Sequence, residues 1–411
     1  MKQDQYSVLY NVTLSLAVHG TTYTVPTSDI VSITLIHNYD TMTFPIVRIR
    51  FESDLSLIQN ILDYPDDIQI LGNLNGNIYR LDEDTRPSCV SGAKNISFAL
   101  KGYIENKNAP TSKMDQYDNG LPRSSDLNTN NKVPFEIFGY NQSMIYNMKR
   151  LTKSVYHNIP VQDVMEDMLS RRGIYDYKIR IVEQQTKFDQ ILIPNLDIIH
   201  AFAYIDQYYG LYKAGGQLYG DLDKLYITSS STDTTDGSLI PINVEDYKSN
   251  SDMGGLRKYS DGSYIMHALS SNVSILTESD IERIINADSV NAINVNTEDV
   301  QNESLKELYT NSNLSGKDET PNILHKHANP FIASMNAARV KERTTQVDLS
   351  CTGMDIGNLS IESRINLIYQ TAIRGTNLSG MYRMSYANHI LTILDGELFT
   401  STSTFRLCKN Y

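Results

Sequence analysis

The stretch YNVTLSLAV, residues 10–18, decides the fold class at this end of the chain. Its apolar and polar side chains alternate with a period of two, which predicts a half-buried β-strand. Similar patterns predict further strands at residues 22–26, 30–38, 46–51, 67–71 and 96–104. One short helix is expected over residues 54–62, where Ser53 or Asp54 can cap it and the apolar side chains share one face. Several strands around one helix predict a compact barrel or sandwich over residues 1–105.

The same alternation returns at the other end of the chain, over residues 344–407. Asp395-Gly396 lies between two alternating runs, and both residues accept the positive φ of a type I′ turn. This pattern predicts a hairpin formed by residues 381–394 and 397–407. We therefore expect a mainly β chain of the α+β class, with two similar antiparallel β-barrels and a mixed α/β insert.

The middle of the chain has helical periodicity. Residues 161–169 place apolar side chains, including Met165 and Met168, on one helical face, and we expect that face to be core. The Arg-Arg-Gly of residues 171–173 is typical of a helix C-terminus. A second helix is expected after Asn195, which would cap it; this helix contains Ile198, Ile199, Phe202 and Ile205 and ends before Gly210.

The remaining elements of the middle are expected from shorter patterns. Strands are predicted at residues 177–182, 211–214 and 224–227, the last two pairing around Gly215-Gly216, with an extended run at 264–276. Loops are predicted at residues 105–132 and 229–251, an irregular stretch at 286–320, and helices at 277–286 and 330–341.

Composition limits the possible functions. A formal charge of −12 argues against a protein that grips duplex nucleic acid, because such proteins need lysine and arginine to displace counterions. Cys89, Cys351 and Cys408 are too scattered for a disulfide framework, so reduced, buried thiols are expected. The sequence shows neither a signal peptide nor a membrane span, and we expect the chain to be made and folded in a cytoplasm.

The histidines offer little chemistry. His325 and His327 are spaced to share a metal on a strand, but no third ligand is near, which favours a solvated pair. His389 lies in an alternating run, so we expect a hydrogen-bonded structural residue and not a general base.

Acidic and glycine-rich segments are equally weak candidates. Asp221 with Asp223, and the run of Asp63, Asp66 and Asp67, lack the spacing of a calcium loop and are interpreted as surface carboxylates. The glycines at positions 215, 216 and 220 do not open a helix, which argues against a phosphate site. No catalytic, cofactor-binding or metal-binding residue is therefore assigned.

Three segments resemble the baseplate hub proteins of contractile-tailed phages, the hub part of type VI secretion spike proteins and the phage late control protein D family. Residues 190–210, followed by 225–227, resemble the family's strand, helix and hairpin. Residues 336–339, followed by 347–353 and 361–367, resemble its helix leading into the last barrel. Residues 382–407, with His389, resemble its closing strands. Departures are Glu362-Ser363, where the family often has Pro-Gly, and two polar segments without a counterpart.

The resemblance implies a structural, non-enzymatic role. Such hubs are homotrimers in which each chain carries two tube-like barrels, so that six barrels meet a sixfold tail tube on one side and a threefold central spike on the other. The implied partners are tube, spike and baseplate wedge proteins, with DNA only as passing cargo and no stable membrane association. The implied location is the tail baseplate of the virion, after assembly in the host cytoplasm. Carboxylates facing the channel are a further expectation.

The resemblance also suggests domain boundaries. We expect a first barrel at residues 1–105, a linker and mixed α/β domain at 106–195, part of the second barrel with a hairpin at 196–276, an irregular or helical connector at 277–343, and the rest of the second barrel at 344–411.

Two other functions stay open: a tail-associated peptidoglycan hydrolase and a host-binding tail-tip protein. A separate lytic domain would favour the first, and fibrous repeats would favour the second.

Overall fold

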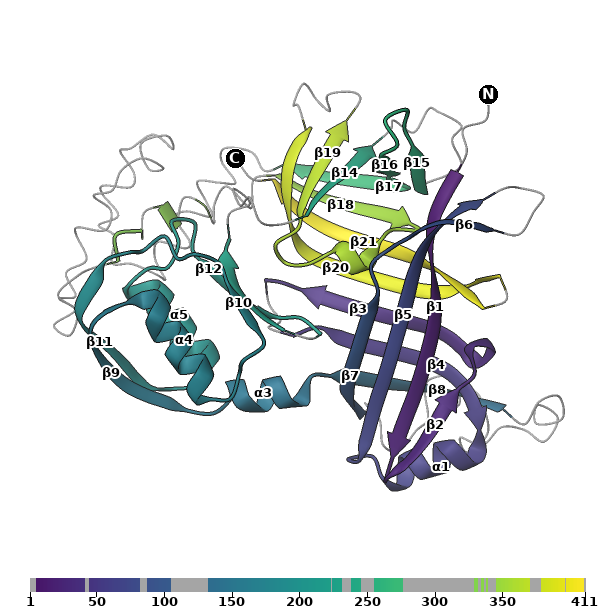
Figure 1. Cartoon of the computed structure of the whole chain (residues 1–411), viewed down its shortest axis with the longest axis horizontal. Coiled ribbons are helices and arrows are strands. Elements are labelled where there is room, and N and C mark those ends of the chain that lie inside the picture. The colour runs from purple at the N-terminus through teal and green to yellow at the C-terminus, as the bar shows by residue number, and fades with distance from the viewer. Residues whose placement is uncertain are drawn as a thin grey trace.

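The computed structural model describes residues 5–40, 44–81, 87–104, 132–222, 224–230, 238–244, 255–275, 329–331, 334–335, 338, 345–369, 378–395 and 397–409. These residues form two bodies, each with its own hydrophobic core. Figure 1 shows a large body of strands at the right, here the β body, and a smaller body with helices at the left, here the α/β body. The predicted loop at 105–132, except Lys132, and the predicted helix at 277–286 lie outside the described residues, as does most of 330–341.

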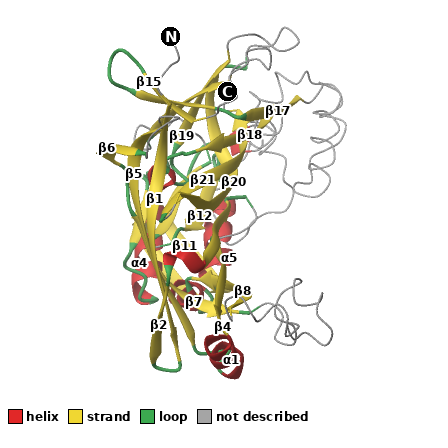
Figure 2. Cartoon of the chain, turned by 90° about the vertical axis from the view of Figure 1, so that its right-hand side faces the viewer, coloured by secondary structure: helices red, strands yellow, loops and turns green. Residues whose placement is uncertain are grey.

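The N-terminal part of the β body follows the predicted alternation. Its strands are β1 (Gln5–Val18), β2 (Thr21–Val25), β3 (Ile30–Asn38), β4 (Ile46–Asp54), β5 (Ile68–Leu81), β6 (Ser88–Gly92), β7 (Ile96–Tyr103) and β8 (Lys132–Tyr140). The 3-10 helix η1 (Thr27–Asp29) and helix α1 (Leu55–Asp63) connect them. Helix α1 places Leu57, Ile58 and Ile61 in the core, and Figure 2 shows it at one end of the molecule.

The later part of the chain completes the same body. Its elements are β14 (Leu239–Val244), β15 (Gly255–Lys258), β16 (Tyr264–His267), β17 (Ser270–Ile275), β18 (Thr345–Thr352), η4 (Ile356–Asn358), β19 (Arg364–Tyr369), β20 (Gly380–Asp395) and β21 (Leu398–Lys409). Asp395 pairs with Leu398, so the predicted β20–β21 hairpin is confirmed. The polar stretch at 229–251 was predicted to be a loop, but it contains β14.

Strand pairing joins both ends of the chain in one 16-stranded sheet. Strands β1, β15, β16, β14, β19, β20, β3, β4, β8, β7 and β5 pair in that order, and β5 returns to β1, which closes a ring of 11 strands. Strand β21 pairs with both β1 and β20 and therefore links two sides of this ring. The result is two closed circuits of strands that share β1, β20 and β21. Strand β14 pairs in parallel with β16 and β19, which differs from the expected antiparallel pattern.

The α/β body consists of α3 (Gln142–Met148), β9 (Thr152–Pro160), α4 (Val161–Arg171), β10 (Tyr177–Ile179), β11 (Lys187–Leu196), α5 (Ile198–Tyr208), β12 (Gly216–Gly220) and β13 (Leu225–Ser229). Helices α4 and α5 lie between the β9–β11 pair and the β10–β13–β12 sheet (Figure 1). Met165 and Met168 are buried in this core, which confirms their interpretation as core residues. Gly173 ends α4 with a φ of +74°, as the Arg-Arg-Gly pattern predicts.

Three local expectations were wrong. Asp197, not Asn195, caps α5, because its carboxylate accepts a hydrogen bond from the His200 amide at 2.8 Å. Residues 211–214 form no strand, and β12 begins only at Gly216, because the chain turns at Gly215 with a φ of +86°. Cys89 is exposed, whereas the other two cysteines are buried and all three are free.

One domain boundary differs from the expected division. Residues 196–276 were assigned to the second barrel, but α5, β12 and β13 pack mainly in the core of the α/β body. The physical reason is that the apolar face of α5, formed by Ile198, Phe202 and Ile205, is buried against this core. The other boundaries stay a prediction.

Candidate assembly site at the junction of the two bodies

The α/β body meets the β body through one inserted tyrosine. Tyr219 extends from β12 and is fully buried in the core of the β body, although most of its hairpin packs in the other core. Its hydroxyl lies 2.8 Å from Nδ1 of His37 on β3, and its ring lies 4.5 Å from that of Tyr39. A side chain of one body therefore occupies the core of the other.

A second histidine lies beside this contact. The His389 ring on β20 is 5.9 Å from that of His37, and its Nδ1 lies 2.8 Å from the Ser403 hydroxyl on β21. Burial lowers the pKa of both histidines; for His37 the Asp221 carboxylate opposes this shift, and for His389 the neighbouring His37 adds to it. Both rings are therefore neutral at pH 7. His389 is a buried, hydrogen-bonded residue, as expected from the sequence.

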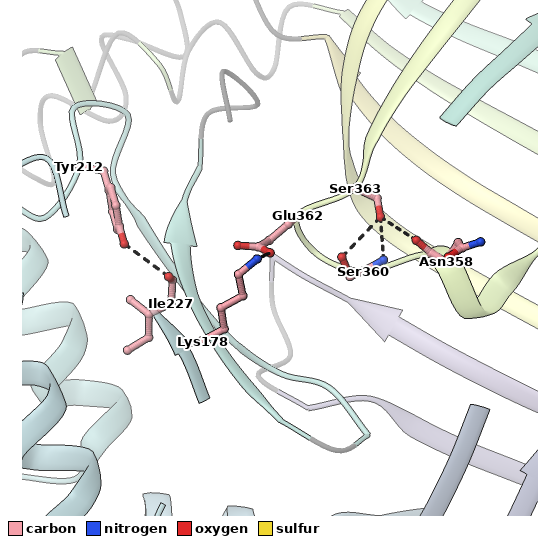
Figure 3. A network of polar contacts seen from close by, with 7 residues as sticks. All are labelled: Lys178, Tyr212, Ile227, Asn358, Ser360, Glu362 and Ser363. Carbon is pink, nitrogen blue, oxygen red and sulfur yellow. Dashed lines mark hydrogen bonds and ion pairs between the residues drawn. The ribbon is translucent and has the colours of Figure 1, made fainter. Parts of the chain in front are cut away.

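An ion pair forms a second contact between the bodies, as Figure 3 shows. The Lys178 ammonium on β10 lies 2.6 Å from the Glu362 carboxylate in the loop before β19. The Glu362 side chain is only 6% exposed, whereas that of Lys178 is 43% exposed. The carboxylate thus gives up much of its hydration and depends on the ammonium for compensation.

Further hydrogen bonds lie on both sides of this ion pair (Figure 3). On the β-body side, the Ser363 hydroxyl accepts from the Ser360 amide at 2.9 Å and donates to the Asn358 carbonyl at 3.2 Å. On the other side, the Tyr212 hydroxyl lies 3.4 Å from the Ile227 carbonyl, next to the strand that carries Lys178. The ion pair therefore joins strand β10 of the α/β body to the loop before β19 of the β body.

A glycine permits close packing at the same junction. A Cβ at Gly220 would lie 2.5 Å from Cε1 of Phe44 and 2.9 Å from Sδ of Met144. The position thus requires a residue without a side chain. The glycines at 215, 216 and 220 lie at the start and end of β12, and Gly220 forms this contact.

The other sequence candidates do not converge. His325, His327 and Asp223 lie outside the described residues. Asp63, Asp66 and Asp67 are exposed, and Asp67 lies 3.5 Å from His19. Within the described ranges, no group of three or more histidine, cysteine or acidic side chains is arranged to hold a metal ion. In that same part of the chain, no helix has the length and hydropathy needed to span a bilayer.

Sequence reasoning missed both junction contacts. His37 occupies an inward position of β3 after Ile33 and Leu35, so a polar residue in an apolar row was the available signal. Lys178 and Glu362 carry no local signal, because 184 residues separate them.

Three of the solved structures similar to this chain are two phage-tail-type proteins and a type VI secretion component. A tail protein from Neisseria meningitidis MC58 has a TM-score of 0.49 at 9% identity, covering 97% of both chains. The 43 kDa tail protein of prophage MuSo2 from Shewanella oneidensis has a TM-score of 0.47 at 9% identity, covering 96% of both chains. A type VI secretion component of E. coli has a TM-score of 0.45 at 9% identity, covering 96% of this chain and 77% of that one. No curated protein matches the sequence significantly.

The family assignment comes from the sequence. The family model described as Bacteriophage PBS1 gene 109 protein matches residues 6–406. This match spans nearly the whole chain, and the chain belongs to that family. The expected relationship to phage proteins is thereby confirmed.

Proposed function

We propose that this chain is a structural hub protein of a contractile-tail baseplate, acting as a trimer that joins a sixfold tail tube to a threefold central spike. The observation that carries the proposal is the pair of closed strand circuits that share β1, β20 and β21. Three chains with two such circuits each present six units to the tube, while the trimer keeps a threefold axis for the spike. Closed rings need this matching of contact surfaces.

The junction supports a fixed geometry between the two bodies. Tyr219 is enclosed in the β body, and the Lys178–Glu362 pair joins the bodies at a second place. Two separate contacts oppose rotation about either one. A fixed α/β body suits a protein that transmits force between rings.

We propose that the role is not enzymatic. The His389–Ser403 pair resembles a nucleophile and its base by residue type alone. Ser403 is completely buried and His389 is 2% exposed, so a substrate cannot reach them. Both side chains instead complete hydrogen bonds inside the sheet.

The proposed partners follow from this role. They are two further copies of the chain, the tail tube protein or a ring that ends the tube, the central spike and the surrounding wedge proteins. DNA would pass through the channel as cargo, and the protein would reside in the virion tail baseplate.

The oligomeric state tests the proposal. Sedimentation equilibrium of the purified full chain is expected to give the mass of three 46.5 kDa chains. A monomer or a dimer across the accessible concentration range would contradict it. A zymogram on cell-wall peptidoglycan should show no clearing; clearing would favour the hydrolase alternative.

A further inference from the structure

One end of the α/β body concentrates positive charge. Five cationic side chains lie in two short segments, residues 149–153 and 171–172, and we call this surface the basic end. They are Lys149, Arg150, Lys153, Arg171 and Arg172. All except the half-buried Arg172 are exposed. This density of cations contrasts with a chain whose formal charge is −12.

The two segments lie side by side. The Arg172 guanidinium donates a hydrogen bond to the Leu151 carbonyl. A Cβ at Gly173 would lie 4.0 Å from Nδ2 of Asn147. Figure 1 shows α3 next to the lower end of the α/β body. The cations therefore form one surface.

Large side chains close to these cations in the sequence are exposed. Tyr146 is 67% exposed, Leu151 is 55% exposed and Tyr175 is 74% exposed. Cations after α3 and at the end of α4 also stabilise helix C-termini, which explains their presence without a partner. Helix stabilisation does not explain why the two tyrosines and the leucine are exposed to solvent. Tyrosine and arginine together are typical of the centre of a protein–protein interface.

Among the residues that the structure describes, Asp167 supplies the carboxylate that pairs with a cation of the basic end. Asp167 Oδ2 lies 2.8 Å from Nε of Arg171 and accepts a hydrogen bond from the Tyr156 hydroxyl at 2.7 Å. Asp176 is exposed nearby in sequence. The surface thus retains excess positive charge, and a complementary partner must present carboxylates around an apolar centre.

We infer that the basic end docks on a neighbouring copy of this chain; this inference rests on the proposed trimer. The chain carries a net negative charge outside the basic end, so another copy offers the required carboxylates. Two basic ends facing each other would repel. The contact must therefore join two different surfaces. Repeated contacts of that kind form a ring where the rotation between copies closes, as the proposed trimer requires.

Charge reversal tests the inference on the full-length chain. The test variant is Lys149→Glu with Arg150→Glu, both at exposed positions of the basic end. The matched control is Lys187→Glu with Lys213→Glu, which changes the net charge equally at other exposed positions of the same body. Lys187 pairs with Pro160, at the end of β9 away from the basic end.

Sedimentation velocity at low and physiological salt measures the outcome. The test variant should raise the dissociation constant of the trimer about 100-fold, because carboxylates then face carboxylates. The control variant should leave it within about threefold, since its charges lie outside the contact. Circular dichroism of both variants verifies that each remains folded.

A second variant separates packing from charge. Tyr146→Ala with Tyr175→Ala should also weaken the trimer, without changing its salt dependence.

If the wild-type chain is trimeric and both basic-end variants are equally trimeric, the inference is overturned while the proposed function stands. A monomeric wild-type chain overturns both. Retention of duplex DNA is measured for the same proteins. If the wild-type chain retains DNA and a basic-end variant loses it but stays trimeric, the surface binds nucleic acid and the inference is overturned.

Discussion

The hydroxyl of Tyr10 accepts a hydrogen bond from the Ile356 amide at 2.9 Å, across 346 residues of sequence. It also donates to the Met354 carbonyl at 3.1 Å. Burial is the main cause that raises the pKa of Tyr10 far above its usual range, so the hydroxyl stays protonated. The first strand is thereby tied to the segment that follows β18. The two ends of the chain build one body.

Tyr10→Phe should destabilise the protein by about 0.5–1.5 kcal/mol, because it removes both hydrogen bonds of the buried hydroxyl. The loss stays moderate, since the Ile356 amide and the Ser401 hydroxyl still donate to the Met354 carbonyl. Urea unfolding followed by circular dichroism measures the change. The control is Tyr64→Phe, at a ring that is 40% exposed. Equal stability of both variants would contradict the assigned role.

Gly353→Ala should destabilise the protein more than Gly20→Ala. Both glycines have positive φ, +65° and +78° respectively. A Cβ at Gly353 would lie 2.0 Å from Oγ of Ser7, whereas nothing lies within 4 Å at Gly20. Backbone strain is common to both variants, so the difference reports the clash, and we expect it to be about 1–3 kcal/mol. Thermal unfolding of the two variants checks the order.

Stability should fall as the pH drops below about 6.5. His37 and His389 have pKa values lowered from 6.5 in the folded chain, so the unfolded chain binds more protons below that pH. The stability that these two histidines contribute is fully present above pH 6.5. It is lost as the pH falls towards their lowered pKa values in the folded chain. The slope is at most about 1.4 kcal/mol per pH unit for each histidine.

A histidine variant checks this assignment. His389→Asn removes one of the two titrating rings and keeps a polar group near Ser403, so the pH slope of the free energy of unfolding should fall by about half. His157→Asn, at an exposed position, serves as the control and should leave the slope unchanged. Identical slopes for all three proteins would exclude His389 as a cause of the pH dependence.

The Lys178–Glu362 pair should show strong coupling. Lys178→Met leaves the nearly buried carboxylate uncompensated, and we expect a loss of about 1–3 kcal/mol. Glu362→Gln in the same chain should recover part of that loss, since the buried charge is then absent. A double-mutant cycle measures the coupling. The exposed Arg171–Asp167 pair is the comparison, with an expected coupling of about 0.3–0.5 kcal/mol.

Sequence reasoning succeeded where pattern and burial coincide. Residues 10–18 alternate between buried and more exposed side chains within β1, and residues 30–38 form β3 with the predicted bounds. The β14 segment was missed, because a short run containing Pro241 has no alternating pattern. Backbone hydrogen bonds to β19 make this segment a strand, although its local sequence does not indicate one. The Tyr219–His37 contact was missed for a similar reason: its partners are 182 residues apart, and only the folded chain brings them together.

A threefold reconstruction of the intact tail at the junction of tube and spike tests the central claim most directly. The account predicts three copies of this chain around the axis, each contributing two strand circuits to a ring of six units below the tube. A single circuit per chain in that ring, or one copy placed away from the axis, would contradict it.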